Sequence, residues 1–313
     1  MNRNRVNALA FLVVLCPAIT LATAPRTFVA STGMDTNPCS RVAPCRSFTA
    51  ALAQTTSGGS IIVVDSAGYG PVNIGQSVSL IAPPGVYAGI TVTFGVAIGI
   101  NGTSATDVIV LRGLSIEGLG GFSGILTGTG ASLKTLQVQN CFISGFSEWG
   151  IDFEPSNMGA SLFVEDTSIA ACDVGIFSGK GDPAANPRAS ISYCRVERGN
   201  YGIWLDDTTG TIRNSVVDGN ANRAFRARAS SQITIENCQA SNNLFGVGSE
   251  DTAVVRVANS TITNNTIGVD STSGNTPGLI LTRISGDPMN PVKTNTLENN
   301  GINGTFTGTF TAQ

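Results

Sequence analysis

The sequence predicts an all-β protein built as a solenoid, a single-stranded parallel β-helix, and three observations lead to this fold class. The first is composition: Gly accounts for 37 of 313 residues, charged residues for 12%, and Val, Ile, Thr, Ser and Asn are abundant. Such a composition favours strands and turns over helices. The second is an internal repeat of 22 to 27 residues. The third is that each unit holds short alternating apolar runs and lacks helical periodicity.

The repeat is clearest in the second half of the chain, where residues 233–247 and 255–269 align with an offset of 22 residues. A small residue marks each unit, and the markers are Gly124, Gly150, Gly175, Gly202, Ala224, Gly246 and Gly268. A unit this short cannot bury its own apolar face and must stack on its neighbours. Leucine-rich repeats would need a ladder of Leu, and a propeller would need a longer, four-stranded unit. A β-sandwich with accidental self-similarity remains the alternative.

Residues 1–24 are predicted to be a signal peptide. Arg3 and Arg5 precede an apolar run, and Ala22-Thr23-Ala24 fits a signal peptidase site. The run is short for a membrane span. We therefore expect a protein that is secreted or held in the periplasm or at the cell surface, with no membrane insertion of the mature form. An uncleaved anchor is the alternative, because Pro25 directly follows the expected cut.

The next segment, "RTFVASTGMDTNPCSRVAPCRSFTAALAQTTSGGSIIVVDSAGYGPVNI", resembles the start of secreted right-handed parallel β-helix proteins of the pectin lyase-like superfamily. The resemblance implies a right-handed helix whose first coil is capped by a strand and a short amphipathic helix. Phe48, Ala51 and Leu52 have the spacing of a helix lying on an apolar end. A turn at Gly58-Gly59 and the strand "SIIVVD" should follow.

This resemblance divides the chain into four parts. They are the signal peptide at 1–24, an N-terminal strand and capping helix at 25–60, some nine to eleven coils at 61–300, and a final strand or cap at 301–313. Within the coils, "GVYAGITVTFGVAIGIN" at 85–101 is expected to form buried strands and not a membrane helix. The resemblance specifies fold and says little about function, because this fold carries lyases, hydrolases, epimerases, phage tailspikes and adhesins.

Six cysteines follow the signal peptide, and an exported protein favours disulfides. Cys39 and Cys45 flank a turn containing Pro44 and are expected to pair. By contrast, Cys141, Cys194 and Cys238 occupy equivalent positions two coils apart, or about 9.6 Å, which exceeds the roughly 7 Å limit for a disulfide. These three, and Cys172 elsewhere in its coil, are expected to be buried free thiols. Asn140, Asn214, Asn237 and Asn259 also share one position per coil and are expected to form a hydrogen-bonded asparagine ladder.

The chain contains no His, which excludes Ser-His-Asp and Cys-His catalysis and His-ligated metal. A formal net charge of -3 without a basic cluster gives no electrostatic basis for nucleic-acid binding. Carboxylates and Arg remain, and they gain meaning where they stack in columns on one outward face. Two positions after each marker the column reads Asp152, Phe177, Trp204, Arg226, Gly248, Asp270. Four positions after it the column reads Glu154, Gly179, Asp206, Arg228, Glu250, Thr272.

These two columns should line one surface, because residues i and i+2 of a strand share a face. An aromatic side chain flanked by carboxylates and Arg suits an acidic polysaccharide or a cell-surface glycan. Trp204, Phe177 and Glu250 are the predicted substrate-binding residues. Arg226, Arg228 and Asp206 are the predicted catalytic residues of a β-eliminating lyase. Asp152, Glu154 and Asp206 are the candidate ligands for Ca²⁺, the one cofactor that the pattern suggests.

Other interpretations of the same columns stay open. A glycosidase would use paired acids on nearby coils, and Asp206 with Asp207 is a poor pair because adjacent strand residues face opposite ways. Asp206, Arg228 and Glu250 could instead form a charge ladder that only stabilises the stack, in an adhesin-like structural module without catalysis. "WLDD" at 204–207 only superficially echoes a pectate lyase motif, and polygalacturonase motifs are absent. No catalytic residue is transferred from either family. The sequence does not indicate an oligomeric state.

Overall fold

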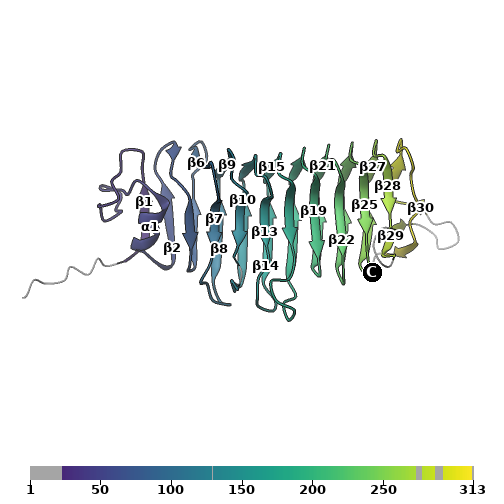
Figure 1. Cartoon of the computed structure of the whole chain (residues 1–313), viewed down its shortest axis with the longest axis horizontal. Helices are drawn as coiled ribbons and strands as arrows, with labels where there is room; N and C mark the ends of the chain where they lie inside the picture. Colours follow the sequence, from purple (N-terminus) through teal and green to yellow (C-terminus); the bar gives the residue numbers. More distant parts are fainter. Residues whose placement is uncertain (1–22, 129, 273–276, 286–291, 312–313) are drawn as a thin grey trace, which may run out of the picture.

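The protein folds into a parallel β-solenoid in which the strands of successive coils stack side by side along one long axis (Figure 1). The structure is a computed structural model that describes residues 23–128, 130–272, 277–285 and 292–311. Each coil contributes a strand to up to three sheets, here called sheets A, B and C, so that every third strand in the chain is a neighbour in space. The all-β solenoid predicted from the repeat is confirmed.

The described residues form three long sheets and one helix, α1 (Phe48–Gln54). The strands of sheet A are β1 (Ala24–Val29), β2 (Thr55–Val63), β5 (Val78–Ile81), β8 (Val108–Arg112), β11 (Thr135–Gln139), β14 (Ser161–Glu165), β17 (Arg188–Ser192), β20 (Thr209–Arg213), β23 (Gln232–Glu236), β26 (Val254–Ala258), β29 (Leu279–Ser285), β30 (Val292–Lys293) and β32 (Gly308–Thr311). Those of sheet B are β3 (Ala67–Gly68), β6 (Ala88–Val92), β9 (Leu114–Gly118), β12 (Phe142–Ser144), β15 (Ser168–Ala170), β18 (Arg195–Glu197), β21 (Val216–Asp218), β24 (Gln239–Ser241), β27 (Thr261–Thr263) and β31 (Thr296–Glu298). Those of sheet C are β4 (Val72–Ile74), β7 (Val96–Ile100), β10 (Ser123–Thr127), β13 (Trp149–Phe153), β16 (Val174–Ser178), β19 (Tyr201–Asp206), β22 (Arg223–Arg228), β25 (Phe245–Ser249) and β28 (Ile267–Asp270).

Ladders of aliphatic side chains fill the space between the sheets. In sheet B the inward residues of successive coils pair in register, and they are Ile116, Ile143, Ile169, Val196, Val217, Ala240, Ile262 and Leu297. Sheet C contributes an equivalent ladder of Ile98, Ile125, Ile151, Ile176, Ile203, Phe225, Val247 and Val269. Each fully buried side chain of this size contributes about 1.5–3 kcal/mol, so the stacking of like on like supplies the core that no single coil has.

Helix α1 closes the N-terminal end of the solenoid, as Phe48, Ala51 and Leu52 predicted. Phe48 and Ala51 are fully buried and Leu52 packs against the core. Ser47 caps the helix by accepting a hydrogen bond from the backbone N–H of Ala50. Cys39 and Cys45 form the predicted disulfide beside it.

The Gly58-Gly59 turn is corrected by the structure, because β2 runs through both glycines. Gly58 has a φ of +82° and the pairing with β1 shifts register at this point, from Ala24 opposite Thr55 to Arg26 opposite Ser60. The glycines therefore make an irregularity within one strand, which is the role that a left-handed Gly plays in a bulge.

The asparagine ladder exists, but not in the predicted column. Asn140, Asn214, Asn237 and Asn259 each have a positive φ of 49–53° and occupy left-handed turn positions. The ladder is formed instead by Asn220, Asn243, Asn265 and Asn300. Each of the first three donates from its side-chain Nδ2, at 3.0 Å, and from its backbone N–H, at 2.9–3.0 Å, to the Oδ1 of the Asn on the next coil. Asn tolerates left-handed geometry better than most residues, which explains why a second Asn column arises without a ladder.

Four cysteines, Cys141, Cys172, Cys194 and Cys238, are buried free thiols, as predicted. In the corner that holds Cys141, Cys194 and Cys238, the coils alternate between Cys and a hydroxyl residue. The hydroxyls of Thr167, Ser215 and Ser260 accept a hydrogen bond from the backbone N–H of the Cys on the preceding coil. Burial raises the pKa of these thiols, that of Cys194 to about 12, so they stay protonated and serve the packing.

The predicted signal peptide lies almost wholly outside the described residues, as does Cys16. No helix within residues 23–128, 130–272, 277–285 and 292–311 has the length and hydropathy needed to cross a membrane. At the other end of the chain, β32 pairs with β29, while Gly268 and Val269 donate their N–H groups to the carbonyls of Ile302 and Asn303.

Candidate functional site

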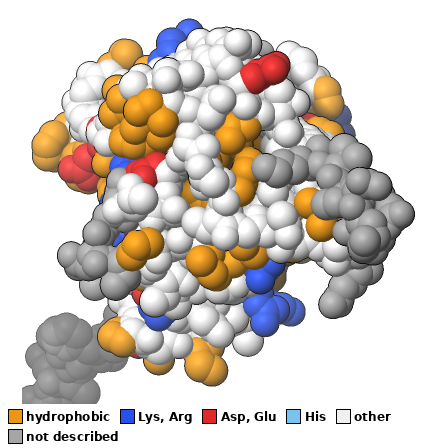
Figure 2. All heavy atoms as spheres, turned by 90° about the vertical axis from the view of Figure 1, so that its right-hand side faces the viewer, with side chains coloured by type: hydrophobic (Ala, Val, Ile, Leu, Met, Phe, Trp, Pro, Cys, Tyr) orange, Lys and Arg blue, Asp and Glu red, His pale blue; other side chains and the backbone are white. Residues whose placement is uncertain are grey.

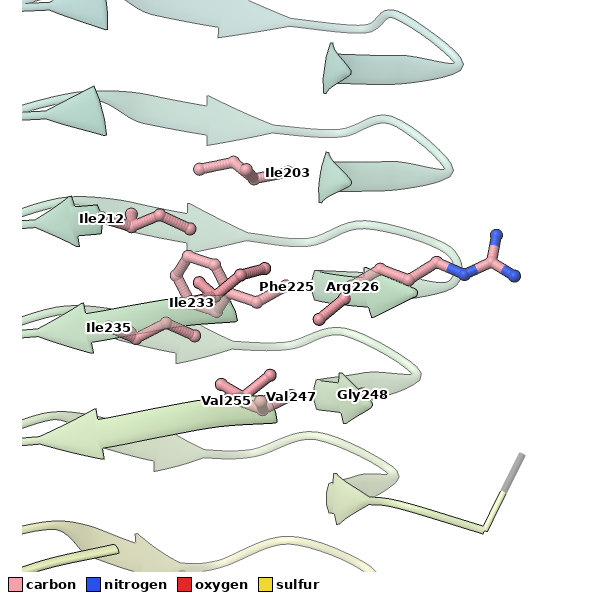
Figure 3. A pocket seen from close by; sticks show the side chains of 10 residues that line it. Ile203, Ile212, Phe225, Arg226, Ile233, Ile235, Val247, Gly248 and Val255 are labelled. Atoms are coloured by element: carbon pink, nitrogen blue, oxygen red, sulfur yellow. The ribbon is translucent and has the colours of Figure 1, made fainter. Parts of the chain in front are cut away.

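The first predicted column forms on the outer face of sheet C. Asp152 lies opposite Phe177, Phe177 opposite Trp204, and Trp204 opposite Arg226. Gly248 and Asp270 continue the column in β25 and β28. Figure 3 shows why the column faces outward: Arg226 points away from the solenoid, while its neighbour Phe225 points into the core. The interior beside Phe225 is lined by apolar side chains, among them Ile203, Ile233 and Val247.

Four aromatic rings gather on this face. Trp149, Phe177, Tyr201 and Trp204 have ring centroids 4.8–6.4 Å apart, and the Phe177 and Trp204 rings meet edge to face at 5.2 Å. Phe177 is buried, whereas Trp149, Tyr201 and Trp204 are partly exposed. Trp149 and Tyr201 are not among the predicted site residues, and they stand one position before the markers Gly150 and Gly202. A third outward column read at that offset would have found them.

Arg226 is held tightly against these rings. Its guanidinium lies 4.0 Å from the centroid of Trp204 and 5.2 Å from that of Tyr201. Nε and Nη2 donate to the two carboxylate oxygens of Glu250 at 3.2 and 2.8 Å. Glu250 is only 4% exposed. Arg226 and Glu250 thus form a bidentate, largely buried ion pair, called the clamp below. This pair holds the guanidinium of Arg226 over one side of the Trp204 ring.

Arg223 completes this clamp from the adjacent outward position. It pairs with Glu250 and Asp270, each at 3.3 Å, and lies 4.4 Å above the ring of Phe245. Gly248 makes this possible, because a Cβ there would come within 2.7 Å of Arg223 Nε. The gap in the column at Gly248 is therefore a slot occupied by Arg223.

Arg228 differs from the two buried arginines, because its side chain is 45% exposed. It lies 3.9 Å from Asp206 and 3.3 Å from Asp251. The predicted ladder of Asp206, Arg228 and Glu250 is therefore wrong in its last member: Asp251 takes the place of Glu250, which turns to Arg226. Arg228 is the arginine of this face that is open to an incoming ligand.

The carboxylates of the face have distinct environments. Burial, together with the nearby Glu154 and Glu148, raises the pKa of Asp152 to about 8. Its Oδ1 has no hydrogen-bond partner among the described residues. Burial and Asp206 raise the pKa of Glu154. Burial also raises the pKa of Asp206, although Arg228 opposes the rise.

These acids do not gather around a common point. In the part of the chain that the structure describes, no three His, Cys, Asp or Glu side chains lie close enough to hold a metal ion. The calcium role of Asp152, Glu154 and Asp206 therefore stays a prediction, and no chemical step is derived through a metal below.

A hollow of 240 Å³ lies at the carboxyl ends of β10 and β13, lined by Leu126, Thr127, Gly128, Glu154, Lys180 and Gly181. Lys180 lies 3.3 Å from Asp207. Although burial opposes it, hydrogen bonds from Ser230 and Lys180 lower the pKa of Asp207, so this carboxylate is ionised. Lys180 was not predicted, because it lies in a loop outside the repeat and no column passes through it.

The sequence and the fold agree with known proteins at the level of architecture. The family described as "right handed beta helix region" matches residues 96–283 and 184–311. Pectate lyase Pel9A has a similar crystal structure, with a TM-score of 0.56 at 15% identity over 83% of this chain and 79% of its own. A rhamnogalacturonan lyase structure has a TM-score of 0.40 at 12% identity over 88% and 80%, which is too distant to carry an argument. No curated protein sequence matches the chain. Identities this low show a shared fold alone.

Proposed function

The chain belongs to the right-handed β-helix family, and from this premise we propose that it binds an acidic polysaccharide along the outer face of sheet C. The observation that carries the proposal is the in-register aromatic column centred on Trp204, with a clamped arginine on one side and an exposed arginine beside it. Pectate lyase Pel9A, which shares the fold, acts on a carbohydrate by name. A polymer that lies along the solenoid axis would cross β13, β16, β19 and β22.

The residues of this face would have different roles in recognising the polysaccharide. Trp204 and Tyr201, which are both partly exposed, would pack against the apolar side of a sugar. Arg228 offers an exposed guanidinium to a uronate carboxylate. Arg226, Glu250 and Phe177 touch Trp204 or its neighbours and hold the ring in place, so their role is to position it. Arg226 is poorly placed to remove a proton, because Glu250 and the Trp204 ring engage its nitrogens.

One observation favours hydrolysis as the cleavage reaction. Glu154 and Asp206 stand in one column two coils apart, with Gly179 between them, which corresponds to a backbone separation of about 9.6 Å. Glu154 leans over Gly179, since its Oε1 lies 3.6 Å from where a Cβ of Gly179 would be. This backbone separation is at the upper end of the roughly 6.5–9.5 Å between the carboxyl groups of inverting glycosidases, and the lean of Glu154 would shorten the distance between its carboxyl group and that of Asp206. In this scheme Glu154 protonates the leaving oxygen, because burial and Asp206 both raise its pKa, and Asp206 activates a water molecule, because Arg228 opposes the rise of its pKa.

The test is incubation of the protein with acidic and neutral polysaccharides, with and without Ca²⁺, while binding, new reducing ends and unsaturated-uronide absorbance are recorded. We expect Trp204→Ala to weaken binding of polygalacturonate by at least about tenfold, or about 1.4 kcal/mol. Trp204→Phe should retain most of it, because an aromatic face remains. Phe142→Ala is the matched control, since Phe142 is an exposed aromatic residue on sheet B.

The products decide the chemistry. Reducing ends that disappear in Glu154→Gln and Asp206→Asn would establish hydrolysis. Unsaturated products that disappear in Arg228→Ala would establish β-elimination in its place. Absence of both binding and products across the panel would contradict the proposal and favour the adhesin-like structural module.

A further inference from the structure

The C-terminal end of the solenoid leaves the edge of one strand open. Strand β32 is parallel to β29 and, among the strands that the structure describes, pairs with β29 alone. Leu279 of β29 donates its N–H toward β26, to the carbonyl of Ala253. Alternation along the strand then turns Thr282 toward β32, so Thr309, which lies opposite Thr282, directs its own N–H and C=O away from β29. These groups face the open edge.

The open edge lacks the features that protect exposed strands in monomeric proteins. Such strands usually carry charged side chains or Pro, or are covered by a loop. Residues 299–311 contain neither a charged residue nor Pro. The tetrapeptide GTFT occurs twice among them, at 304–307 and 308–311, and its alternation suits a strand. Thr309 and Thr311 are exposed, and Phe310 is partly exposed.

The core beside this edge is incompletely covered. A hollow of 390 Å³ lies at this end of the solenoid, and Ile267, Val269 and Phe306 are among the residues that line it. Ile302 also lines it and is 63% exposed. A partner at this end would therefore shield apolar surface as well as pair with the open strand.

At the N-terminal end, by contrast, the edge of sheet A is covered. Phe28 of β1 donates its backbone N–H to the carbonyl of Cys39 and accepts a bond from the N–H of Cys45. The disulfide between Cys39 and Cys45 ties this covering loop together. Pro25 removes one N–H from the same strand. Head-to-tail stacking of copies would therefore meet a covered edge, which leaves contact between two C-terminal ends.

We propose that the chain forms a closed dimer in which β32 pairs with β32 of a second copy, antiparallel and tail to tail. A two-fold axis at Thr309 relates the strands, so the two Thr309 residues lie opposite each other and exchange N–H···O bonds. Gly308 then lies opposite Phe310 of the other copy, and an aromatic ring covers a residue without a side chain. Two uncharged strands meet without like-charge repulsion. This dimer does not depend on the function proposed for sheet C.

The test is sedimentation velocity of the full chain over a wide range of protein concentrations. The mass should rise from that of one chain to that of two and no further, because a two-fold contact closes. Thr309→Lys should weaken the dimer by at least about tenfold, since it places like charges opposite each other. Thr309→Glu should do the same, and an equimolar mixture of the two variants should restore the dimer. Thr91→Lys, at an exposed strand position on sheet B, is the matched control and should dimerise like the wild type.

Cysteine substitution locates the contact. The two Thr309 Cα atoms would be about 5.5 Å apart, which is within the range of a disulfide. Under oxidising conditions Thr309→Cys should form a covalent dimer, whereas Thr91→Cys should not. Because Thr309 is exposed, far-UV circular dichroism and the Tm of its variants should match those of the wild type.

Four outcomes would overturn the closed dimer. They are the mass of one chain at every concentration, masses above that of two chains, a dimer that Thr309→Lys leaves unchanged, and a mixture of Thr309→Lys with Thr309→Glu that stays monomeric.

Discussion

Among single residues, Arg226 shows how a side chain's neighbours define its role. The column predicted a catalytic arginine, whereas Glu250 and Trp204 hold the guanidinium on both sides. Arg228, two positions along the same strand, remains exposed. The two arginines thus differ in burial and in the number of groups that engage them, and these are differences that a sequence pattern cannot display.

This difference predicts unequal costs of substitution. Arg226→Met should lower the free energy of unfolding by about 3 kcal/mol, because it leaves the buried Glu250 with only one arginine partner. Arg228→Met should cost at most about 1 kcal/mol, because exposed ion pairs contribute little. Urea unfolding of both variants measures the comparison. Equal losses would show that the clamp at Glu250 is not the tighter interaction.

Asp152 predicts a dependence of stability on pH. Its pKa is about 8 in the folded protein, against an ordinary 3.8, so the folded state keeps a proton that the unfolded chain releases. The stability that this proton provides is complete below pH 3.8, declines as the pH rises, and is lost above about pH 8. Asp152→Asn should therefore be more stable than the wild type at pH 9 by several kcal/mol and should flatten this part of the profile.

Asp107 supplies the opposite case as a control. Although burial opposes it, hydrogen bonds from Ser104 and Ser77 lower the pKa of Asp107. Asp107→Asn should therefore destabilise the protein at neutral pH, and this loss should shrink as the pH falls below 4. Thermal unfolding from pH 3 to pH 9 measures both variants. Parallel profiles for the wild type and Asp152→Asn would disprove the buried, unpaired state of Asp152.

At the level of strands and turns, the sequence predicted the regular parts of a coil and not its corners. The marker residues lie at one register position because alternating apolar residues, such as Ile203 and Leu205, force the strand face inward. The corners follow other rules. Asn237 and Asn243 are the same residue type six positions apart, yet one needs a left-handed backbone and the other a buried amide. Composition and spacing do not distinguish these two requirements.

For the candidate site, the sequence likewise predicted positions along the strands but not the directions of the side chains. The first column is correct in register along its whole length, and the second is correct where Asp206 lies opposite Arg228, because strand period and repeat length determine these positions. The directions of long side chains were not predictable, since they depend on gaps such as Gly248, where Arg223 crosses the column. The loop residue Lys180 was also missed, because loops lie outside the repeat. The repeat pattern predicts the register of the strands, but it does not predict which side chains contact one another.

The two asparagine columns predict different responses to substitution. At Asn237, which has a φ of 53°, Gly should be nearly neutral and Ala should cost about 1 kcal/mol, because left-handed geometry penalises a Cβ. At the buried Asn243, Gly and Ala should each cost about 2–4 kcal/mol, because Asn220 and Asn265 lose hydrogen-bond partners. Chemical denaturation of the four variants measures this. Equal tolerance of Gly at both positions would contradict the distinction.

Over the whole molecule, the two ends of the solenoid are closed in different ways. Helix α1 and the disulfide cover the N-terminal end, with Phe48 fully buried against Tyr69 at a ring-centroid distance of 5.4 Å. Figure 2 looks onto the C-terminal end, where hydrophobic side chains appear among the polar surface. Ile302 there is 63% exposed. Because each coil contacts mainly its neighbours, we expect unfolding to begin at the end of the solenoid that is less well covered.

Removal of the N-terminal cap should therefore act locally. Phe48→Ala should cost about 3–5 kcal/mol and should expose the coils closest to α1 first. Hydrogen exchange should accelerate in β2 and β5 while β19 and β22 in the middle of the stack remain protected. Phe163→Ala, at an exposed site, is the control and should change neither region. Uniform acceleration along the whole stack would show that the solenoid unfolds as one unit.

The central claim, that an acidic polysaccharide lies along the outer face of sheet C, is tested most directly by hydroxyl-radical footprinting with mass spectrometry. Trp149, Tyr201 and Trp204 are oxidisable probes on the proposed path, and Phe163 and Tyr193 are exposed references away from it. Added hexagalacturonate should protect the three probes together and leave both references unchanged. Protection confined to the references, or no protection at a saturating concentration, would contradict the account.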